Sequence, residues 1–174
     1  MRTYTYTHPK EIESISEIPI IDNNEQVVAI AKRIYTNRLK KALDQFFDYR
    51  YFLKYDIYNT LGEKTFTIRK VFKRGKLWYE GFDCHLNKKY IITYENWKIG
   101  IPELTITDGT IRIQINKQME EWSEFLFEGN VIARWKAEFS NDQFYMTLHV
   151  EENSPVQNVA FFIAISQATL FVGA

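Results

Sequence analysis

Cysteine is nearly missing from this chain, which contains Cys84 alone and therefore cannot form an intrachain disulfide bond. Glycine and proline are also few, at 7 and 4 residues, and no stretch has the composition of a flexible linker. Neither sign of charge dominates, because 22 Lys and Arg balance 22 Asp and Glu. No overall field draws the chain to nucleic acid, and we predict one domain over residues 1–174.

The chain also lacks the motifs of common catalytic and cofactor sites. It contains no G-x-S-x-G, no G-x-x-x-x-G-K-[ST], no G-x-G-x-x-G and no pair of Cys or His spaced for zinc. Adjacent Cys84 and His85 would point to opposite faces of a strand, with Cys84 packed inside and His85 in solvent. The segment from Asp22 to Glu25 lacks the Gly and the downstream Glu of a calcium loop and is expected to be a turn. We predict a non-enzymatic protein with no catalytic residues, no metal and no cofactor.

The first ten residues, MRTYTYTHPK, lack the apolar run of a secretory signal peptide. They alternate Thr with Tyr4 and Tyr6 instead, which predicts a short strand that stops at His8-Pro9. We therefore expect a cytoplasmic protein, either free or peripheral at the membrane.

Aromatic residues are abundant, at 16% of the sequence, and many short segments alternate apolar with polar residues. Aromatic side chains favour strands, and alternation is typical of strands with one buried face. About ten to twelve such segments follow one another between residues 2 and 150, separated by turns. Many short strands joined by turns predict an antiparallel barrel or sandwich.

The clearest turn signal is the Asp-Gly dipeptide between the strand segments ELTIT and TIRIQIN. A two-residue type I′ turn at this dipeptide would pair Thr107 with Thr110. The same register would pair Leu104 with Ile113 and place the apolar side chains of both strands on one face.

Two stretches are predicted to be helical, and the first covers residues 37–48. Its apolar residues Leu39, Leu43, Phe46 and Phe47 recur at helical spacing, and Asn37 can cap the first turn. This pattern predicts one short amphipathic helix on the surface.

The second helical stretch lies within the last twenty-one residues, which carry no charged side chain. Ser154 and Gln157 match a capping box and Pro155 suits a first turn, which predicts a helix from Pro155 to Val172. Because its apolar side chains point in all directions, it must be enclosed by protein or by lipid. Ser166 is expected to bond to a carbonyl one turn earlier. Gln167 should bond to a strand or face a polar cavity.

A helix of this length, roughly 27 Å, matches strands of about eight residues. We therefore predict a mainly β protein: a closed antiparallel β-barrel of about twelve strands that encloses the hydrophobic C-terminal α-helix. Small inward side chains would make room for that helix. Candidates for these positions are Ala29, Ala31, Ala133 and Ala137.

The terminal segment FFIAISQATLFVGA resembles the signature of tubby-like proteins, whose final helix reads F-A-I-A-L-S-S-F-D and runs through a closed twelve-stranded barrel. The matching positions are Phe161, Ile163, Ala164, Ile165 and Ser166. The chain looks most like small bacterial members of the tubby C-terminal-like superfamily, which is related to phospholipid scramblases and LURP-one-related proteins.

The resemblance covers the terminal helix and has two departures. Ala168 and Thr169 stand where the family has Phe-Asp, and the basic residues that bind phosphoinositides in animal tubby have no match here. The resemblance thus implies binding of membrane lipid without indicating which residues bind it.

Two groups of basic residues stand out from the neutral background. The first group, our candidate lipid-binding site, consists of Arg69, Lys70, Lys73, Arg74 and Lys76 around one predicted hairpin. The second group consists of Lys32, Arg33, Lys40 and Lys41, near the predicted surface helix. Each basic side chain near an anionic bilayer contributes about 1 kcal/mol, so either group would support weak, salt-sensitive adsorption. The alternative is a solvated face whose charges oppose nearby Glu63, Glu80 and Asp44.

These observations predict a non-enzymatic, tubby-like binding module for anionic phospholipid headgroups or a protein partner. No nucleic-acid partner is expected, and the oligomeric state is left open. Two alternatives also remain open: a tail-anchored membrane protein that uses the C-terminal helix as its span, and an enzyme whose site has no visible motif.

Overall fold

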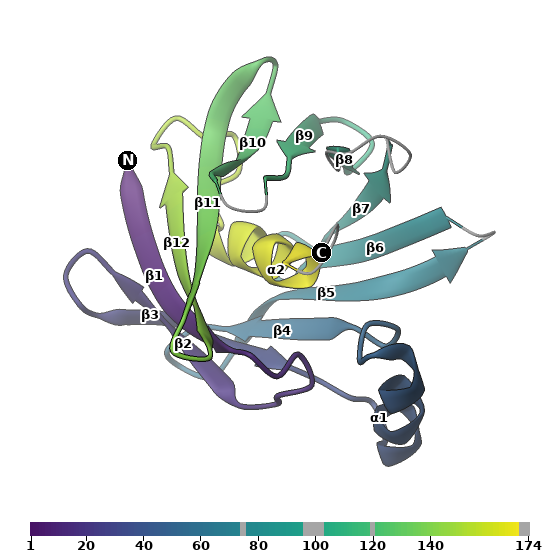
Figure 1. Cartoon of the computed structure of the whole chain (residues 1–174). Helices are drawn as coiled ribbons and strands as arrows, with labels where there is room; N and C mark the ends of the chain where they lie inside the picture. The colour runs from purple at the N-terminus through teal and green to yellow at the C-terminus, as the bar shows by residue number, and fades with distance from the viewer. Residues whose placement is uncertain (74–75, 96–102, 119–120, 171–174) are drawn as a thin grey trace.

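The structure is a computed structural model that describes residues 1–73, 76–95, 103–118 and 121–170, with residues 72, 73, 76 and 77 described by backbone alone. Twelve described strands form a closed barrel in which every strand pairs with its neighbours in sequence and β1 also pairs with β12 (Figure 1). The strands are β1 (Arg2–Pro9), β2 (Glu17–Asp22), β3 (Val27–Arg33), β4 (Lys54–Tyr58), β5 (Lys64–Lys73), β6 (Lys76–Asp83), β7 (Lys88–Tyr94), β8 (Glu103–Thr107), β9 (Arg112–Asn116), β10 (Ser123–Phe127), β11 (Asn130–Ser140) and β12 (Gln143–Val150). The predicted closed antiparallel barrel is confirmed.

Strand β1 is longer than the sequence pattern predicts, because it runs through His8 and ends at Pro9 instead of stopping before them. Pro9 pairs with Gln143 at the start of β12, and the His8 side chain is buried. The alternation of inward side chains therefore continues from Tyr4 through Tyr6 to His8.

The hairpin between β8 and β9 has a register two residues away from the predicted one. Leu104 lies opposite Ile115, and Thr107 lies opposite Arg112. The prediction of a two-residue type I′ turn is wrong because only Gly109, and not Asp108, has a positive φ. The Asp108 carboxylate instead accepts hydrogen bonds from the backbone N–H groups of Thr110 and Ile111 and stabilises a longer loop. A shift of two residues leaves the apolar side chains on the predicted face.

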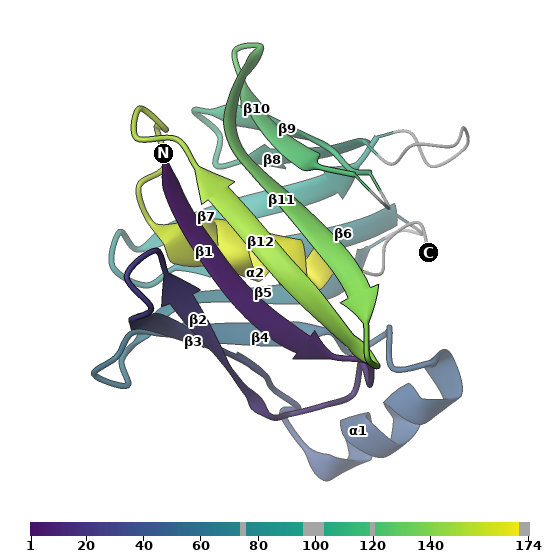
Figure 2. The ribbon, with the colours of Figure 1, turned by 60° about the vertical axis from the view of Figure 1, so that its left-hand side comes forward.

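Helix α2 (Val159–Thr169) lies inside the barrel, as both ribbon views show (Figures 1 and 2). All its residues from Ala160 to Thr169 are buried, and it contacts β3, β4, β5, β6 and β12. The Phe161 ring packs against Tyr90 and Phe66, with ring centroids 4.9 and 5.8 Å apart. Phe162 packs edge-on against Phe125 at 5.1 Å. Protein therefore encloses this helix, as predicted.

The small side chains expected to make room for α2 are inside the barrel. Ala29, Ala31 and Ala133 are buried, and Ala137 is partly buried against the core. In the described part of the chain, no helix has the length and apolar character needed to cross a membrane.

The start of α2 differs from the prediction by four residues. Asn158 is the N-cap and accepts the backbone N–H of Ala160, whereas the predicted capping box would have started the helix at Pro155. Ser154 instead bonds to the backbone of Val156, and the Gln157 amide donates to the carbonyls of Glu152 and Ser154. These contacts stabilise a turn between β12 and the helix, which has 11 residues.

Two polar side chains of α2 are fully buried and differ in their partners. Ser166 donates to the Ile163 carbonyl, as predicted, and also shares a hydrogen bond of 2.9 Å with the Tyr6 hydroxyl. Neither polar atom of the Gln167 amide has a hydrogen-bond partner among the described residues. Within the described part of the chain Gln167 therefore does not form the first of its two predicted alternatives, a hydrogen bond to a strand, and the second, a polar cavity, stays a prediction.

Helix α1 (Arg38–Asp44) and the short 3-10 helix η1 (Gln45–Phe47) lie outside the barrel (Figure 2). The predicted cap is confirmed, since the Asn37 side chain accepts the Lys40 backbone N–H. The helix lies on the surface, as predicted, but its apolar residues face solvent and the buried residue of α1 is Asp44.

Candidate functional site

A buried ion pair holds α1 against the barrel. The Arg33 guanidinium of β3 donates to the Asp44 carboxylate at 2.8 Å, and both side chains have no exposed surface. Tyr35 also donates to this carboxylate, and the backbone N–H groups of Tyr51 and Phe52 each donate to its other oxygen at 2.9 Å. These four donors hold the chain on both sides of η1 in a defined position. A cleft lies between this segment and the barrel wall.

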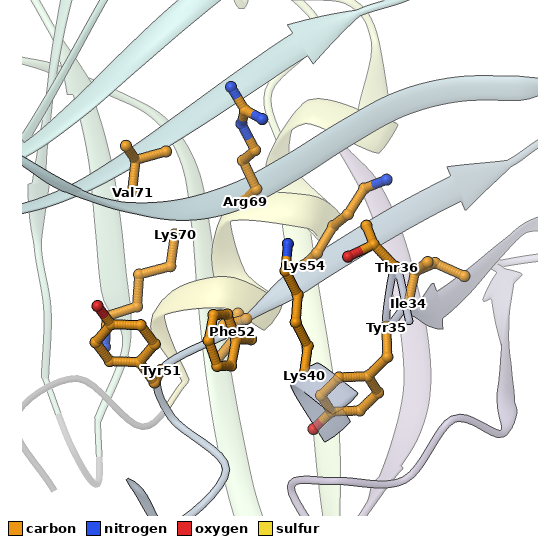
Figure 3. Close-up of a pocket in the computed structure, with 11 residues that line it drawn as sticks. Ile34, Tyr35, Thr36, Lys40, Tyr51, Phe52, Lys54, Arg69, Lys70 and Val71 are labelled. Atoms are coloured by element: carbon orange, nitrogen blue, oxygen red, sulfur yellow. The ribbon is translucent and has the colours of Figure 1, made fainter. Parts of the chain in front are cut away.

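The cleft has a volume of about 410 Å³, within the range of small-molecule sites. Its walls are the segment after β3, one side chain of α1, the segment leading into β4, and β5 (Figure 3). The lining residues are Ile34, Tyr35, Thr36, Lys40, Tyr51, Phe52, Leu53, Lys54, Arg69, Lys70 and Val71. We call this hollow the β4–β5 cleft.

Positive charge dominates the β4–β5 cleft. Lys40, Lys54, Arg69 and Lys70 are four of its eleven lining residues, and no Asp or Glu is among those eleven. Figure 3 shows Lys40 reaching from α1 toward β4 and β5, with Lys54 and Arg69 on the strands beyond it. A site with this lining favours an anion over a cation.

The four basic side chains differ in how strongly they are already engaged. Lys40 lies 5.7 Å above the Phe52 ring, and no described carboxylate lies within ion-pairing distance of it. Lys54 lies 3.6 Å from Asp56, which Lys64 shares.

The side chains of Arg69 and Lys70 extend from opposite faces of β5. The Arg69 guanidinium extends over the outside of the barrel and makes two hydrogen bonds to Glu80. Lys70 donates instead to the Arg50 carbonyl at 2.7 Å, beside the segment that follows η1. Burial lowers the pKa of Lys70 below its ordinary value, and an anion bound nearby would raise it again.

Our candidate lipid-binding residues are only partly described by the structure. Arg69 and Lys70 line the cleft. Lys73 and Lys76 pair through their backbones where β5 meets β6, and their side chains lie outside the described part. Arg74 lies outside the described residues altogether.

The second basic group is divided by the fold. Arg33 is buried beside Asp44 and cannot face a headgroup, so that expectation is wrong for this residue. Lys32 pairs with Glu17 at 3.1 Å, Lys41 is exposed, and Lys40 alone enters the cleft.

Cys84 and His85 lie in the turn after β6 and not on a strand. His85 is exposed as predicted, but Cys84 is only partly buried, because a turn residue need not point into the core. Among the residues with described positions, no group of three His, Cys, Asp or Glu could hold a metal ion.

Sequence patterns missed Lys54, Tyr51 and Phe52 as parts of the site. The available signal was alternation: Lys54 precedes the inward-facing Tyr55 and therefore faces outward beside Arg69, its partner across β4 and β5. The signal for Tyr51 and Phe52 was weaker, because they belong to a segment without regular structure.

Comparisons with known proteins identify the family of the chain. The family model described as the Tubby C-terminal like domain matches residues 4–172. A search of curated proteins found no significant match, and a search of solved structures found none either. The matched range covers α2 and all twelve described strands apart from the first two residues of β1. The chain therefore belongs to the Tubby C-terminal like domain family.

Proposed function

We propose that this protein is a non-enzymatic module that binds anionic phospholipid headgroups in the β4–β5 cleft, at the cytoplasmic face of a membrane. The observation that carries the proposal is a lining with four basic and no acidic side chains. Membership of the tubby-like family supports a lipid as the partner.

The chemistry of the cleft suits a phosphate group. Arg offers several donors in a planar fork and Lys offers a compact positive charge, and both bind phosphate oxygens. Lys40 is the most available cation, because its ammonium rests over a ring and not beside a carboxylate. Tyr51 and Phe52 add apolar surface against which the glycerol part of a headgroup can pack.

Comparison with a second hollow, on the outer face of β5 and β6, supports the choice of the β4–β5 cleft. That hollow shares Lys54 and Arg69 but also contains Glu80. Glu80 bonds both Arg69 and Lys89, so its carboxylate neutralises the cations on that side. The positive charge that remains available is therefore greatest around Lys40.

Vesicle co-sedimentation tests the proposal. The wild type should pellet with phosphatidylglycerol or phosphoinositide vesicles at 0.1 M salt and much less at 1 M, because screening shortens from about 10 Å to about 3 Å. Changing Lys40, Lys54 and Arg69 to Glu should weaken binding roughly a hundredfold, since each basic side chain contributes about 1 kcal/mol. The control variant has Lys10, Arg112 and Lys136 changed to Glu. It alters the net charge by the same amount at positions away from the cleft, and it should bind the vesicles far better than the variant changed in the cleft.

The hairpin between β5 and β6 supplies a second comparison. A variant with Lys73, Arg74 and Lys76 changed to Glu tests the rest of the candidate lipid-binding group. If these residues add only long-range attraction, this variant should lose less vesicle affinity than the cleft variant, in which Lys40, Lys54 and Arg69 are changed to Glu. Equal pelleting of the cleft variant and the wild type would contradict the proposed function.

A further inference from the structure

Four large apolar side chains of α1 and η1 face solvent on one side of the helical segment. Their exposed fractions are 83% for Phe46, 67% for Leu39, 53% for Phe47 and 42% for Leu43. Their spacing of three, four and seven residues places them on one helical face. The exposed fractions show that this face is turned to solvent, on a helical segment that lies outside the barrel (Figure 2). We call these four residues the α1 tip.

The buried side of the segment fixes the tip in this orientation. Asp44 faces the barrel, where its carboxylate meets the Arg33 guanidinium, the Tyr35 hydroxyl and two backbone N–H groups. Rotating the helix to bury the tip would leave Arg33 without its carboxylate inside the protein, which is strongly unfavourable. The apolar face is therefore held outward by the fold.

The charges around the tip indicate what covers it. Arg38 and Lys41 are exposed on α1, and Arg50 is exposed after η1. Asp48 is the exposed acidic residue between residues 36 and 54, because Asp44 is buried and paired. An apolar face flanked by basic residues is typical of helices that lie in the surface of an anionic bilayer.

We propose that the α1 tip inserts into the headgroup and acyl boundary of an anionic phospholipid bilayer. This inference rests on the proposed function, since it adds an apolar anchor to the same membrane contact. The tip adjoins the β4–β5 cleft through packed aromatic rings: the ring centroid of Phe47 lies 4.9 Å from that of Tyr51, which lies 4.8 Å from that of Phe52. With the tip inserted, the mouth of the cleft lies at the depth of the lipid phosphates.

Insertion can be measured with an environment-sensitive fluorophore. The protein with Cys84→Ser and Phe46→Cys is labelled at residue 46 and mixed with vesicles of phosphatidylcholine and phosphatidylglycerol. The control label replaces Leu61, which is 82% exposed in the turn at the end of β4 remote from α1 (Figure 1). The label at 46 should shift to the blue and be quenched by lipids with spin-labelled acyl chains, and the label at 61 should do neither.

Replacement of the apolar side chains gives an independent measure. The variant with Phe46→Ser and Phe47→Ser should bind the same vesicles about tenfold to a hundredfold more weakly, while Leu61→Ser should bind as the wild type does. Both variants should melt as the wild type does, because the replaced side chains are exposed.

Titration with inositol trisphosphate, a soluble headgroup, separates the two proposals. If the tip variant, with Phe46→Ser and Phe47→Ser, binds inositol trisphosphate normally and loses affinity for vesicles, both proposals stand. If the wild type fails to bind inositol trisphosphate while the label at 46 enters the bilayer, the cleft proposal fails alone. If the labels at 46 and 61 behave alike, or the tip variant keeps full vesicle affinity, insertion is overturned. Tip-dependent dimerisation in analytical ultracentrifugation without bilayer entry would also overturn it.

Discussion

Helix α2 carries Phe161 and Phe162 into the barrel with no exposed surface, whereas η1 leaves Phe46 and Phe47 largely in solvent. Helices α2 and α1 also differ in the polar groups that they bury. α2 buries Ser166 within a mostly apolar core, while α1 buries Asp44 in a cluster of charged and polar partners. An apolar helical face therefore predicts burial in one case and misleads in the other.

The difference shows that the partner of each face decides which side of a helix is buried. Strands surround α2 on all sides and leave its apolar residues nowhere else to go. For α1, the barrel offers the Arg33 guanidinium, which can be matched by a carboxylate and not by a leucine. The apolar face of α1 is consequently available for contact with another molecule.

Removing α2 should have the largest effect on stability. Phe161, Phe162, Ile163 and Ile165 are fully buried, and together they represent about 6–12 kcal/mol of burial, comparable to the net stability of a domain. A chain truncated after Asn158 should aggregate and show no cooperative transition in calorimetry. A soluble truncated protein with a normal melt would show that α2 is not the core.

Asp44→Ala should lower the free energy of unfolding by about 3–5 kcal/mol, because it leaves the buried Arg33 without its counter-ion. Urea unfolding gives the value, and hydrogen exchange at the Tyr51 and Phe52 backbone N–H groups should accelerate as α1 detaches. Asp44→Asn serves as the control. It keeps an oxygen that can accept from these two backbone N–H groups, so it should lower the free energy of unfolding less than Asp44→Ala does. A loss below about 1 kcal/mol for Asp44→Ala would mean that the ion pair does not hold α1.

His8 should make the protein less stable in mild acid. Burial, and to a smaller extent the Arg33 charge, lowers the pKa of His8 from its ordinary 6.5 to about 4. The unfolded chain therefore binds more protons between these values, and the stability present above pH 6.5 is progressively lost down to pH 4, by roughly 3 kcal/mol. The difference in unfolding free energy between pH 7 and pH 4 should shrink in His8→Gln. His149→Gln is the control and should change this difference less, because His149 is more exposed.

Gln167→Met should stabilise the protein by about 1 kcal/mol. Its buried amide lacks a partner among the described residues, and a buried unsatisfied amide costs about 1–3 kcal/mol. Met has a similar shape and no polar group to desolvate. Thermal unfolding measures the gain, and a lower melting temperature would instead indicate that the amide is satisfied.

Much of the fold could be predicted from the sequence because its signals are local. Alternating residues and turns identified the strands, and the uncharged terminal stretch identified the enclosed helix. Errors arose where a side chain acted on the backbone near it. Asp108 lengthens the turn between β8 and β9, and Asn158 replaces Ser154 as the cap of α2.

The candidate site was less predictable because its parts come from separate segments. Arg69 and Lys70 were recognised as one basic group and Lys40 as part of another, but no periodic pattern shows that these residues share a cleft. Their proximity depends on the pairing of Arg33 with Asp44, which lie 11 residues apart on different elements. The outward orientation of the α1 tip depends on the same ion pair.

Helix α2 forms the core, and the exposed apolar face of α1 should not contribute to stability. Unfolding by urea of Phe162→Ala and Phe46→Ala, measured side by side, separates these two contributions. We predict a loss of about 3–5 kcal/mol for the buried Phe162 and a change within about 0.5 kcal/mol for the exposed Phe46. Similar losses for the two variants would instead mean that the α1 tip is packed as part of the core.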